Sequence, residues 1–419
     1  MRVRSPELAG HVGQRVQIAG WLQSERALRD VTFLAIRDGA GVVQCVVADP
    51  ARLAPLRAAG AGLESVVEVE GTVVAEPQAA GGVELHGIDL RVVSAVTEPT
   101  PVPLAKKLAN VPLPALLEHA AVANRHPTRR AVFQVAAAAM RGFRRTLDAA
   151  GFTEIQTPKL VGGATEGGAN MFAVEYFDRT AYLAQSPQLY KQIMVGVFER
   201  LYEVGPVFRA EPHETSRHLN QYTSLDVELG FIRDHRDVMA VVTDVVRGML
   251  AEVAALGVAV PAVPAEIPAI HFTDAQARLG EHEPDLTPAG ERALGAWAQA
   301  THGSDFVFVT GYPLATRPFY THGDPERPAS SNSFDLLFRG TELVTGGQRL
   351  HRHADYVAAM EARGMAREPL AAYLDAFRFG MPPHGGFAIG LERFVMQLLG
   401  LPNIRLATLF PRNRSRLAP

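Results

Sequence analysis

Residues 208–228 read FRAEPHETSRHLNQYTSLDVE and hold the pattern that decides the fold. The stretch contains four carboxylates, two arginines and two histidines. Its last residues alternate apolar and acidic side chains in the order Leu225, Asp226, Val227, Glu228. This period of two predicts a strand with one face on a core and a charged opposite face. Arg209 and Glu211 have the same spacing, so we expect them to share the face of an earlier strand, joined to the second by a polar loop. A solvated hairpin would also explain this pattern, so the rest of the chain has to decide.

The composition describes a soluble globular protein with more than one domain. The chain has 419 residues, 47% of them hydrophobic and 20% charged, which is too long for one ordinary core. The formal net charge of −3 provides no general attraction for nucleic acid, so a polyanionic partner has to be held by local patches. Cys45 is the only cysteine, which excludes disulfides and cysteine-rich zinc sites and favours a cytoplasmic location. The most apolar long stretch, roughly 238–263, is interrupted by charges and predicts a buried amphipathic helix and no membrane span.

Three segments predict the domain organisation. Residues 1–97 alternate β-rich runs with turns, and five strands at short spacing favour a small closed barrel of the OB type. Residues 98–127 are rich in proline and poor in periodicity, which predicts a linker or hinge. Residues 128–419 mix strands and helices without a βαβ repeat, so we expect an antiparallel sheet with flanking helices and an α+β fold class.

Several elements of the larger segment are predicted individually. A long helix is expected over 129–150, with Gly151 just past its end, a strand over 152–158 and a helix over 187–198 with Pro187 in its first turn. Further strand pairs are expected over 201–231 and 334–352, and a last strand–helix unit over 387–400.

The chain lacks the common nucleotide-binding signatures. No Gly-Lys pair occurs, which excludes a P-loop, and no G-x-G-x-x-G opens a helix after a strand. Neither H-E-x-x-H nor a Cys/His zinc spacing is present. The charged segments nevertheless supply three arginines for phosphates and two acids for a divalent cation, namely Arg209, Arg217, Arg393, Asp335 and Glu342. These side chains are what a nucleoside triphosphate site without a P-loop requires.

Three segments resemble the signature motifs of class II aminoacyl-tRNA synthetases. FTEIQTPKL, with Pro158, resembles the first motif, which lies at the dimer interface of that class. FRAE…RHLNQYTSLDVE resembles the second motif and GFAIGLERF the third. The class II resemblance implies the fold described above, with the barrel as the anticodon-binding domain.

Two shorter segments narrow the resemblance to the aspartyl-tRNA synthetases. They are SPQLYKQ (186–192) and GGQR (346–349). The match runs over essentially the whole chain and is closest to the short archaeal-type form, because no large insertion separates the second and third motifs. It implies a homodimer that attaches L-aspartate to tRNA(Asp) through an aspartyl-adenylate, with ATP as substrate and Mg²⁺ as cofactor.

The resemblance assigns roles in the ATP site. Arg209 would contact the α-phosphate and the substrate carboxylate, while His218 and Arg393 would hold the β/γ end of a bent ATP. Glu342, together with Asp335, would bind Mg²⁺ through oxygen ligands, as a hard cation prefers. The other residues expected at ATP are Glu211, Arg217, Leu219 and Gly390.

Selection of aspartate is expected to rest on Lys191 and Arg349. Two cations facing one carboxylate would leave buried charge unpaired if asparagine entered, and such sites discriminate by about 10⁴–10⁵. Asp226 would orient Lys191, and Glu166 lies in a Gly-rich segment that suits a closing loop. The remaining residues expected at aspartate are Ser186, Gln188, Arg209 and Thr345.

The barrel is expected to read the anticodon. Phe33 and Gln44 match family positions that stack on and hydrogen-bond the central base, although Phe33 also suits a barrel core. Relatives that reject tRNA(Asn) carry a tryptophan where this chain has Gln23 and a lysine in the loop before Glu84, which AEPQAAGG lacks. We therefore expect charging of both tRNA(Asp) and tRNA(Asn), and a partner amidotransferase that converts Asp-tRNA(Asn).

Two alternatives remain open from the sequence. An asparaginyl-tRNA synthetase shares the fold and chemistry, but that family lacks the lysine at the position of Lys191. A non-catalytic paralogue that binds nucleic acid would have no need for Arg209, Glu342 and Arg393, which are all present.

Overall fold

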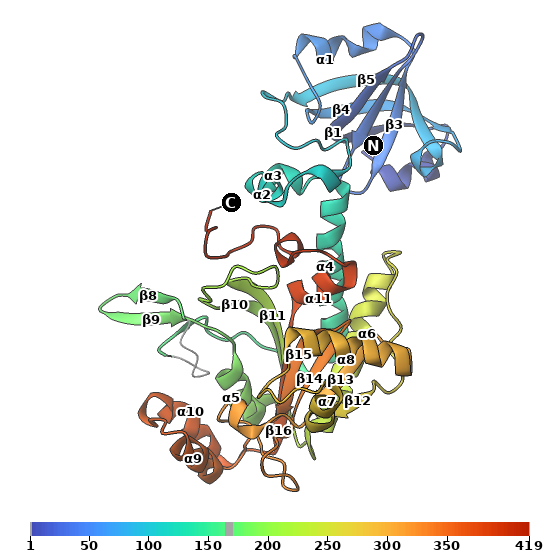
Figure 1. Cartoon of the computed structure of the whole chain (residues 1–419). Helices are drawn as coiled ribbons and strands as arrows, with labels where there is room; N and C mark the ends of the chain where they lie inside the picture. The colour runs from blue at the N-terminus through green and yellow to red at the C-terminus, as the bar shows by residue number, and fades with distance from the viewer. Residues whose placement is uncertain (1, 164–170, 419) are drawn as a thin grey trace. The chain divides into compact units, whose positions relative to one another are not determined.

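The computed structural model describes residues 2–163 and 171–418 and divides into two compact units, Met1–Pro127 and Thr128–Pro419 (Figure 1). Each unit contains its own hydrophobic core. Residues 98–127, predicted as a linker, belong to the first unit and contain the short helices α2 (Leu113–Glu118) and α3 (Ala120–Ala123).

The first unit contains a closed five-stranded barrel in the order β1-β2-β3-β5-β4, as the sequence predicts. Alternate residues fill its interior: Val67 and Val69 are fully buried, whereas Glu68 and Glu70 between and after them face outward. A short helix, α1, covers residues Ala54–Ala58. The strands are Arg15–Ala27 (β1), Thr32–Arg37 (β2), Val42–Val47 (β3), Val66–Ala75 (β4) and Val83–Ser94 (β5).

The second unit is built on an eight-stranded sheet in the order β12-β13-β14-β15-β16-β11-β10-β6. Its inner pairs are antiparallel, as predicted, while the outermost pairs, β12 with β13 and β10 with β6, are parallel. The strands are Thr153–Glu154 (β6), Arg200–Phe208 (β10), Gln221–Gly230 (β11), Ala269–His271 (β12), Phe306–Thr310 (β13), Ser333–Phe338 (β14), Thr341–Gln348 (β15) and His384–Gly390 (β16). A separate three-stranded sheet contains Leu160–Val161 (β7), Ala173–Tyr176 (β8) and Arg179–Leu183 (β9).

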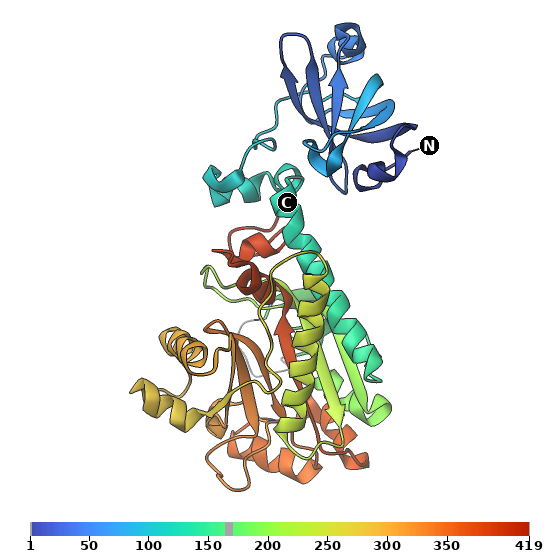
Figure 2. The same ribbon diagram turned by 90° about the vertical axis from the view of Figure 1, so that its right-hand side faces the viewer.

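Two long helices cover one face of the large sheet, and Figure 2 shows them side by side in teal and yellow-green. They are α4 (Pro127–Ala149) and α6 (His235–Ala254). They pack closely because Gly142 has no side chain at their contact. A Cβ on Gly142 would lie only 2.3 Å from the carbonyl oxygen of Gly248. The other helices are Gln188–Phe198 (α5), Phe272–Leu279 (α7), Pro288–His302 (α8), His353–Ala362 (α9), Ala371–Ala376 (α10) and Leu391–Leu399 (α11).

Strand β11 carries the alternation that the sequence predicts. Leu225 and Val227 are fully buried in the core shared with α4 and α6. The intervening polar residues therefore project to the opposite face of the sheet.

Two predicted strands are shorter than expected. β10 ends at Phe208, so Arg209 and Glu211 lie beyond it and do not share a strand face. Pro212 cannot donate to a ladder, and the side-chain amide of Asn220 instead donates to the carbonyl oxygens of Arg209 (2.7 Å) and Glu211 (3.1 Å). The strand expected over 152–158 pairs only through β6, before Pro158.

The apolar stretch beyond residue 238 is also less helical than predicted. Helix α6 ends at Ala254, and Gly257 with a positive φ follows it. No helix among the described residues is long and apolar enough to cross a membrane.

Candidate active site

Two adjoining cavities lie on the face of the sheet opposite α4 and α6. The first, of about 220 Å³, is bounded by the loop between β10 and β11, by β15 and by the start of α11. The second, of about 250 Å³, is bounded by the start of α5, by β11, by the end of β15 and by the segment 316–321. Their shared wall is formed by Arg209, Tyr222, Ser224, Glu342, Thr345 and Ala388.

The register of three neighbouring strands makes the floor of the cavities. Ala388 of β16 lies opposite Asp226 of β11 on one side and opposite Thr345 of β15 on the other. The small Ala388 side chain leaves open space between these polar neighbours. Ser224 donates a 2.5 Å hydrogen bond to Asp226, and the Arg209 guanidinium lies 5.7 Å from the Tyr222 ring centre. Arg209 therefore lies in the wall that divides the two cavities.

The first cavity is rich in basic side chains from distant segments. Arg217 and His218 come from the β10–β11 loop, and Arg393 comes from α11. Arg393 Nη1 donates to the backbone oxygen of Glu342 at 3.0 Å and lies 3.4 Å from its Oε1 atom. Burial lowers the pKa of His218, with Arg393 adding to the effect and Glu211, 3.4 Å away, opposing it. This basic lining suits a polyanion such as a triphosphate.

Three residues that line the second cavity, Lys191, Asp226 and Arg349, form a buried network with Glu228, which lies behind them. Lys191 Nζ lies 3.1 Å from Asp226 Oδ1 and 3.4 Å from Glu228 Oε2. The same Glu228 carboxylate accepts a 3.1 Å hydrogen bond from Arg349 Nε. Burial would raise the pKa of Glu228, but Arg349 and Lys191 together lower it below the ordinary value. The four side chains are at most 9% exposed, so their charges balance within the protein.

Lys191 and Arg349 differ in their free hydrogen-bonding capacity. Lys191 also donates to the backbone oxygens of Val227 and Phe387, so protein atoms surround its ammonium group. Arg349 uses Nε for Glu228 and Nη2 for Gly386 and Gln188. Among the described residues its Nη1 atom has no hydrogen-bond partner, so Arg349 keeps a donor for a ligand.

On the barrel, the outer faces of β2, β3 and β5 bring predicted residues together. Gln44 lies opposite Ala35 of β2 on one side and Glu84 of β5 on the other, and its amide donates to Glu84 at 2.5 Å. Phe33 shares the outer face of β2 with Ala35 and is absent from the buried core, which contains its neighbour Leu34.

Two further side chains adjoin this outer surface. Arg26 of β1 lies over the Phe33 ring at 5.0 Å. Gln23 occupies a β-bulge of β1 between Leu22 and Ser24, where the register shifts. A bulge redirects the side chain it carries. Arg26, Phe33, Gln44 and Glu84 thus form one surface across adjacent strands. Gln23 lies at the bulge of β1, where its side-chain oxygen is buried.

Comparison with known proteins identifies the family. Residues 114–414 match the family model described as tRNA synthetases class II (D, K and N), and residues 16–93 match the OB-fold nucleic acid binding domain. The chain belongs to the class II aminoacyl-tRNA synthetases. The resemblance expected from the sequence is therefore confirmed.

Full-length relatives lie within the aspartyl branch. The Aspartate--tRNA(Asp/Asn) ligase of Thermus thermophilus is 47% identical, and 100% of each chain is covered. The protein of the same name from Deinococcus radiodurans is 46% identical, covering 100% of this chain and 99% of the relative. Among solved structures, asparaginyl-tRNA synthetase from Pyrococcus horikoshii, complexed with asparaginyl-adenylate, is similar with a TM-score of 0.89, 32% identity and full coverage of both chains.

The residues predicted for ATP all line the first cavity of this synthetase. They are Arg209, Glu211, Arg217, His218, Leu219, Glu342, Gly390 and Arg393.

The described residues predicted for aspartate all line the second cavity. They are Ser186, Gln188, Lys191, Arg209, Asp226, Thr345 and Arg349. Glu166, the remaining predicted aspartate residue, lies outside the described residues.

The two acids expected to hold Mg²⁺ have different surroundings in the synthetase. Glu342 lines both cavities and its side chain is 39% exposed. Asp335 is buried and accepts a 2.9 Å hydrogen bond from Arg317 through Oδ2, and burial raises its pKa to about 6 although Arg317 opposes this. Oδ1 of Asp335 is buried and has no hydrogen-bond partner among the described residues.

Several residues of the site were missed from the sequence. Tyr222 and Ser224 extend the alternating polar face of β11 and could have been found by following the period of two upstream from Asp226. Glu392 of α11 is buried and accepts from the backbone N–H of Thr223 at 3.0 Å, and burial raises its pKa to about 7. Glu228 continues the period of two that places Asp226, and could have been found in the same way. Side chains from the segment 316–321 join the site only through tertiary contacts, and no short-range pattern indicates them.

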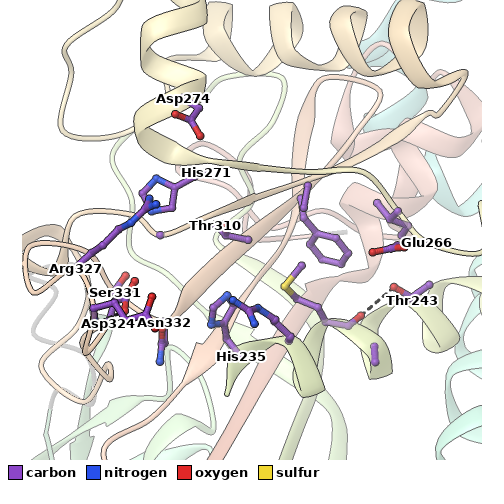
Figure 3. A pocket seen from close by; sticks show the side chains of 18 of the residues that line it. His235, Thr243, Glu266, His271, Asp274, Thr310, Asp324, Arg327, Ser331 and Asn332 are labelled. Atoms are coloured by element: carbon purple, nitrogen blue, oxygen red, sulfur yellow. Dashed lines mark hydrogen bonds between the residues drawn. The ribbon is translucent and has the colours of Figure 1, made fainter. Parts of the chain in front are cut away.

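A larger cavity, of about 650 Å³, lies on the opposite face of the sheet (Figure 3). Helix α6 supplies one wall with His235 and Thr243, and Phe308 of β13 lies beneath. Its other charged side chains have both signs: Arg236, Arg247 and Arg327 against Asp244, Glu266, Asp274, Asp324 and Glu326. None of the residues predicted for substrates is among its described lining. We therefore assign the chemistry of the synthetase to the two smaller cavities.

Proposed function

We propose that the protein is an ATP-dependent aspartate–tRNA ligase that charges both tRNA(Asp) and tRNA(Asn). The expectation of an aspartate–tRNA ligase is confirmed by full-length relatives of that name at 46–47% identity. The observation that carries the proposal is the wall shared by the two cavities, which includes Arg209. A basic cavity for a triphosphate and a cavity with Lys191 and Arg349 meet at this wall.

The reaction proceeds in two steps. The α-carboxylate of aspartate attacks the α-phosphorus of ATP, which forms aspartyl-adenylate and releases pyrophosphate. A hydroxyl of the terminal tRNA ribose then attacks the activated carbonyl carbon, which releases AMP and leaves aspartyl-tRNA. The attacking carboxylate is already ionised, so the first step needs no general base and depends on alignment and charge stabilisation.

Arg209 is placed to serve the first step. From the wall it reaches both cavities, where it neutralises charge on the α-phosphate and orients the attacking carboxylate. Arg217, His218 and Arg393 bind the remaining phosphates from the first cavity.

The acidic pair fits a divalent cation. The buried Oδ1 of Asp335 has no hydrogen-bond partner among the described residues, while Oδ2 accepts from Arg317. This oxygen and the partly exposed carboxylate of Glu342 are ligands of the kind that Mg²⁺ prefers. Mg²⁺ held by these residues supplies positive charge for the phosphate oxygens. Glu342 also accepts hydrogen bonds from Arg393 and from Thr345 (3.0 Å), which orient its carboxylate toward the shared wall.

Aspartate is selected by the cationic end of the second cavity. Arg349 donates a hydrogen bond directly to the side-chain carboxylate of aspartate. Lys191, which Asp226 and Glu228 hold in place, adds positive charge beside it. The side-chain amide of asparagine carries no charge and presents an N–H₂ donor where Arg349 requires an acceptor, and a buried site that pairs a polar group in this way discriminates by about 10⁴–10⁵.

The barrel surface reads the anticodon. The Phe33 ring offers a stacking surface worth about 1–3 kcal/mol per base. Gln44 and Glu84 offer hydrogen-bonding groups beside it. The anticodons for aspartate and asparagine differ only in their third base. Because this chain has Gln23 where a bulky tryptophan would restrict the site, the barrel accepts either third base.

Three further properties belong to the proposal. Charging of tRNA(Asn) with aspartate requires an amidotransferase that converts Asp-tRNA(Asn). The first-motif resemblance at residues 152–160 implies a homodimer, so sedimentation at micromolar concentration should give twice the mass of 45.2 kDa. A cytoplasmic location remains a prediction from the single cysteine.

The decisive experiment combines two assays on the purified protein. Pyrophosphate exchange is measured with aspartate and with asparagine, and charging is measured with tRNA(Asp) and tRNA(Asn) transcripts and labelled aspartate. We expect aspartate-dependent exchange and charging of both transcripts. Exchange with asparagine alone would identify an asparaginyl enzyme, and the absence of exchange would identify a non-catalytic paralogue. A preference for tRNA(Asp) of several-hundredfold in kcat/KM would contradict the dual specificity.

A further inference from the structure

Glu291 is a partly buried acid that contacts two residues of the first cavity, Arg217 and Glu342, from outside it. It lies in the first turn of α8, and its side chain is 13% exposed. Its Oε2 atom accepts a 3.1 Å hydrogen bond from Arg217 Nη2 and a 3.2 Å hydrogen bond from the backbone N–H of Glu342. One carboxylate therefore joins the β10–β11 loop to the start of β15.

The helix that carries Glu291 is held tightly against the turn before β15. A Cβ on Gly295 of α8 would lie 2.5 Å from the backbone nitrogen of Gly340, and Gly340 has a φ of +70°. Thr287 caps the helix by accepting from the Gly290 N–H at 3.0 Å. Close backbone packing and a capped end place Glu291 on a rigid element.

The contacts of Glu291 extend to the other groups of the cavity. Glu342, whose backbone it holds, accepts from Arg393 through both its backbone and its side chain. Arg217 uses Nη2 for Glu291 and for the Thr341 hydroxyl at 3.4 Å. Its Nε and Nη1 atoms have no hydrogen-bond partner among the described residues, so Glu291 leaves them for a ligand.

We propose that Glu291 is a positioning residue for ATP. It holds the Arg217 side chain so that the two free donor atoms of Arg217 face the phosphates, and it holds the strand that carries Glu342. This inference rests on the proposed function of the first cavity. Its contacts do not extend to Lys191, Arg349 or the segment 316–321, and it reaches the second cavity only through Glu342, so ATP binding depends on Glu291 much more than aspartate binding does.

Variants of α8 separate positioning from helix stability. Glu291→Ala removes both hydrogen bonds. Glu291→Gln keeps an oxygen acceptor but loses the charge. Thr287→Ala, one turn earlier on the same helix, removes the cap and leaves Glu291 in place, so it reports the cost of weakening α8 alone.

The readouts are the dissociation constant of ATP in the presence of Mg²⁺, the KM values for ATP and aspartate in pyrophosphate exchange, and the Tm. For Glu291→Ala we expect about a tenfold weaker binding of ATP and a similar rise in its KM, since a hydrogen bond to a charged group is lost. The KM for aspartate should stay within twofold. Glu291→Gln should lie between the wild type and Glu291→Ala. Thr287→Ala should lower the Tm without changing the ATP values.

A double-mutant cycle with Arg217→Ala tests the proposed partner. If Glu291 acts partly through Arg217, adding Glu291→Ala to Arg217→Ala should weaken ATP binding less than it does in the wild type. Fully additive losses, unchanged ATP binding in Glu291→Ala, or an equal rise in both KM values would overturn the inference. If the wild type lacks aspartate-dependent exchange and Glu291→Ala still weakens ATP binding, the result contradicts the proposed function and leaves the role of Glu291 intact.

Discussion

Arg349 donates a hydrogen bond of 3.1 Å from Nε to Oε1 of Glu228, whose other oxygen lies 3.4 Å from the ammonium nitrogen of Lys191. Glu228 is fully buried, so this carboxylate fixes both cations before any ligand arrives. Preorganised charge of this kind costs no rearrangement when the substrate binds.

Replacing Glu228 by glutamine should weaken aspartate binding more than it weakens ATP binding. The neutral amide no longer holds both cations, so we expect the KM for aspartate to rise and the preference for aspartate over asparagine to fall. Breaking a buried ion pair also costs about 3–5 kcal/mol of stability. Glu203→Gln is the matched control, because Glu203 is buried, pairs with Lys159 at 2.6 Å and is not among the described residues that line the cavities. Equal KM values for aspartate in the two variants would contradict the role of Glu228.

Replacing Lys191 by methionine should abolish aspartate-dependent pyrophosphate exchange, because the positive charge behind the cavity is lost. We expect a loss of far more than tenfold. Lys159→Met removes a comparable ion pair elsewhere in the same unit and should retain exchange. The assignment fails if Lys191→Met keeps exchange within tenfold of the wild type while remaining folded by circular dichroism.

Glu392 predicts a pH-dependent stability difference. Its pKa of about 7 in the folded protein exceeds the ordinary 4.5, so the folded state binds more protons than the unfolded state between these values. Stability therefore falls as the pH rises through this window. Glu392→Gln removes this pH-dependent loss of unfolding free energy. The loss is at most about 3 kcal/mol, because a pKa difference of one unit corresponds to 1.36 kcal/mol. The Tm of the variant relative to the wild type should be higher at pH 8 than at pH 5, and a difference that does not change with pH would refute the prediction.

Introducing a bulky side chain at the bulge of β1 should restrict tRNA choice. Gln23→Trp is expected to reduce charging of tRNA(Asn) relative to tRNA(Asp) by about tenfold to a hundredfold, because one base contact is worth about 1–3 kcal/mol. Gln17→Trp is the control, since Gln17 lies on the same strand but its side chain contacts Glu68 of β4. Similar charging ratios for the wild type and both variants would show that Gln23 does not face the deciding base.

Local patterns predicted the elements well and the long-range partners poorly. The alternation in 225–228 was enough to place Asp226 on the polar face, because strand geometry allows only two faces. The prediction of a shared strand face failed at Arg209 and Glu211. Pro212 and the side chain of Asn220, which lie outside the alternating pattern, end β10 early. Family motifs then assigned about half of the residues that line the two cavities.

The partners of individual residues could not be inferred in the same way. Glu228 and Arg349 are separated by 121 residues, and Glu291 is 51 residues from Glu342. Such contacts arise from the packing of whole elements. A single sequence carries no local signal for them.

The wall shared by the two cavities limits how the amino-acid preference could be redesigned. Changes to Arg209, Tyr222 or Glu342 are expected to alter ATP use together with amino-acid choice, since each lines both cavities. The rest of the second cavity, at the start of α5, at the end of β15 and along the segment 316–321, is lined by residues that do not also line the first. Evolution or engineering toward a different amino acid is therefore restricted to that part, while the shared wall and the first cavity have to remain as they are.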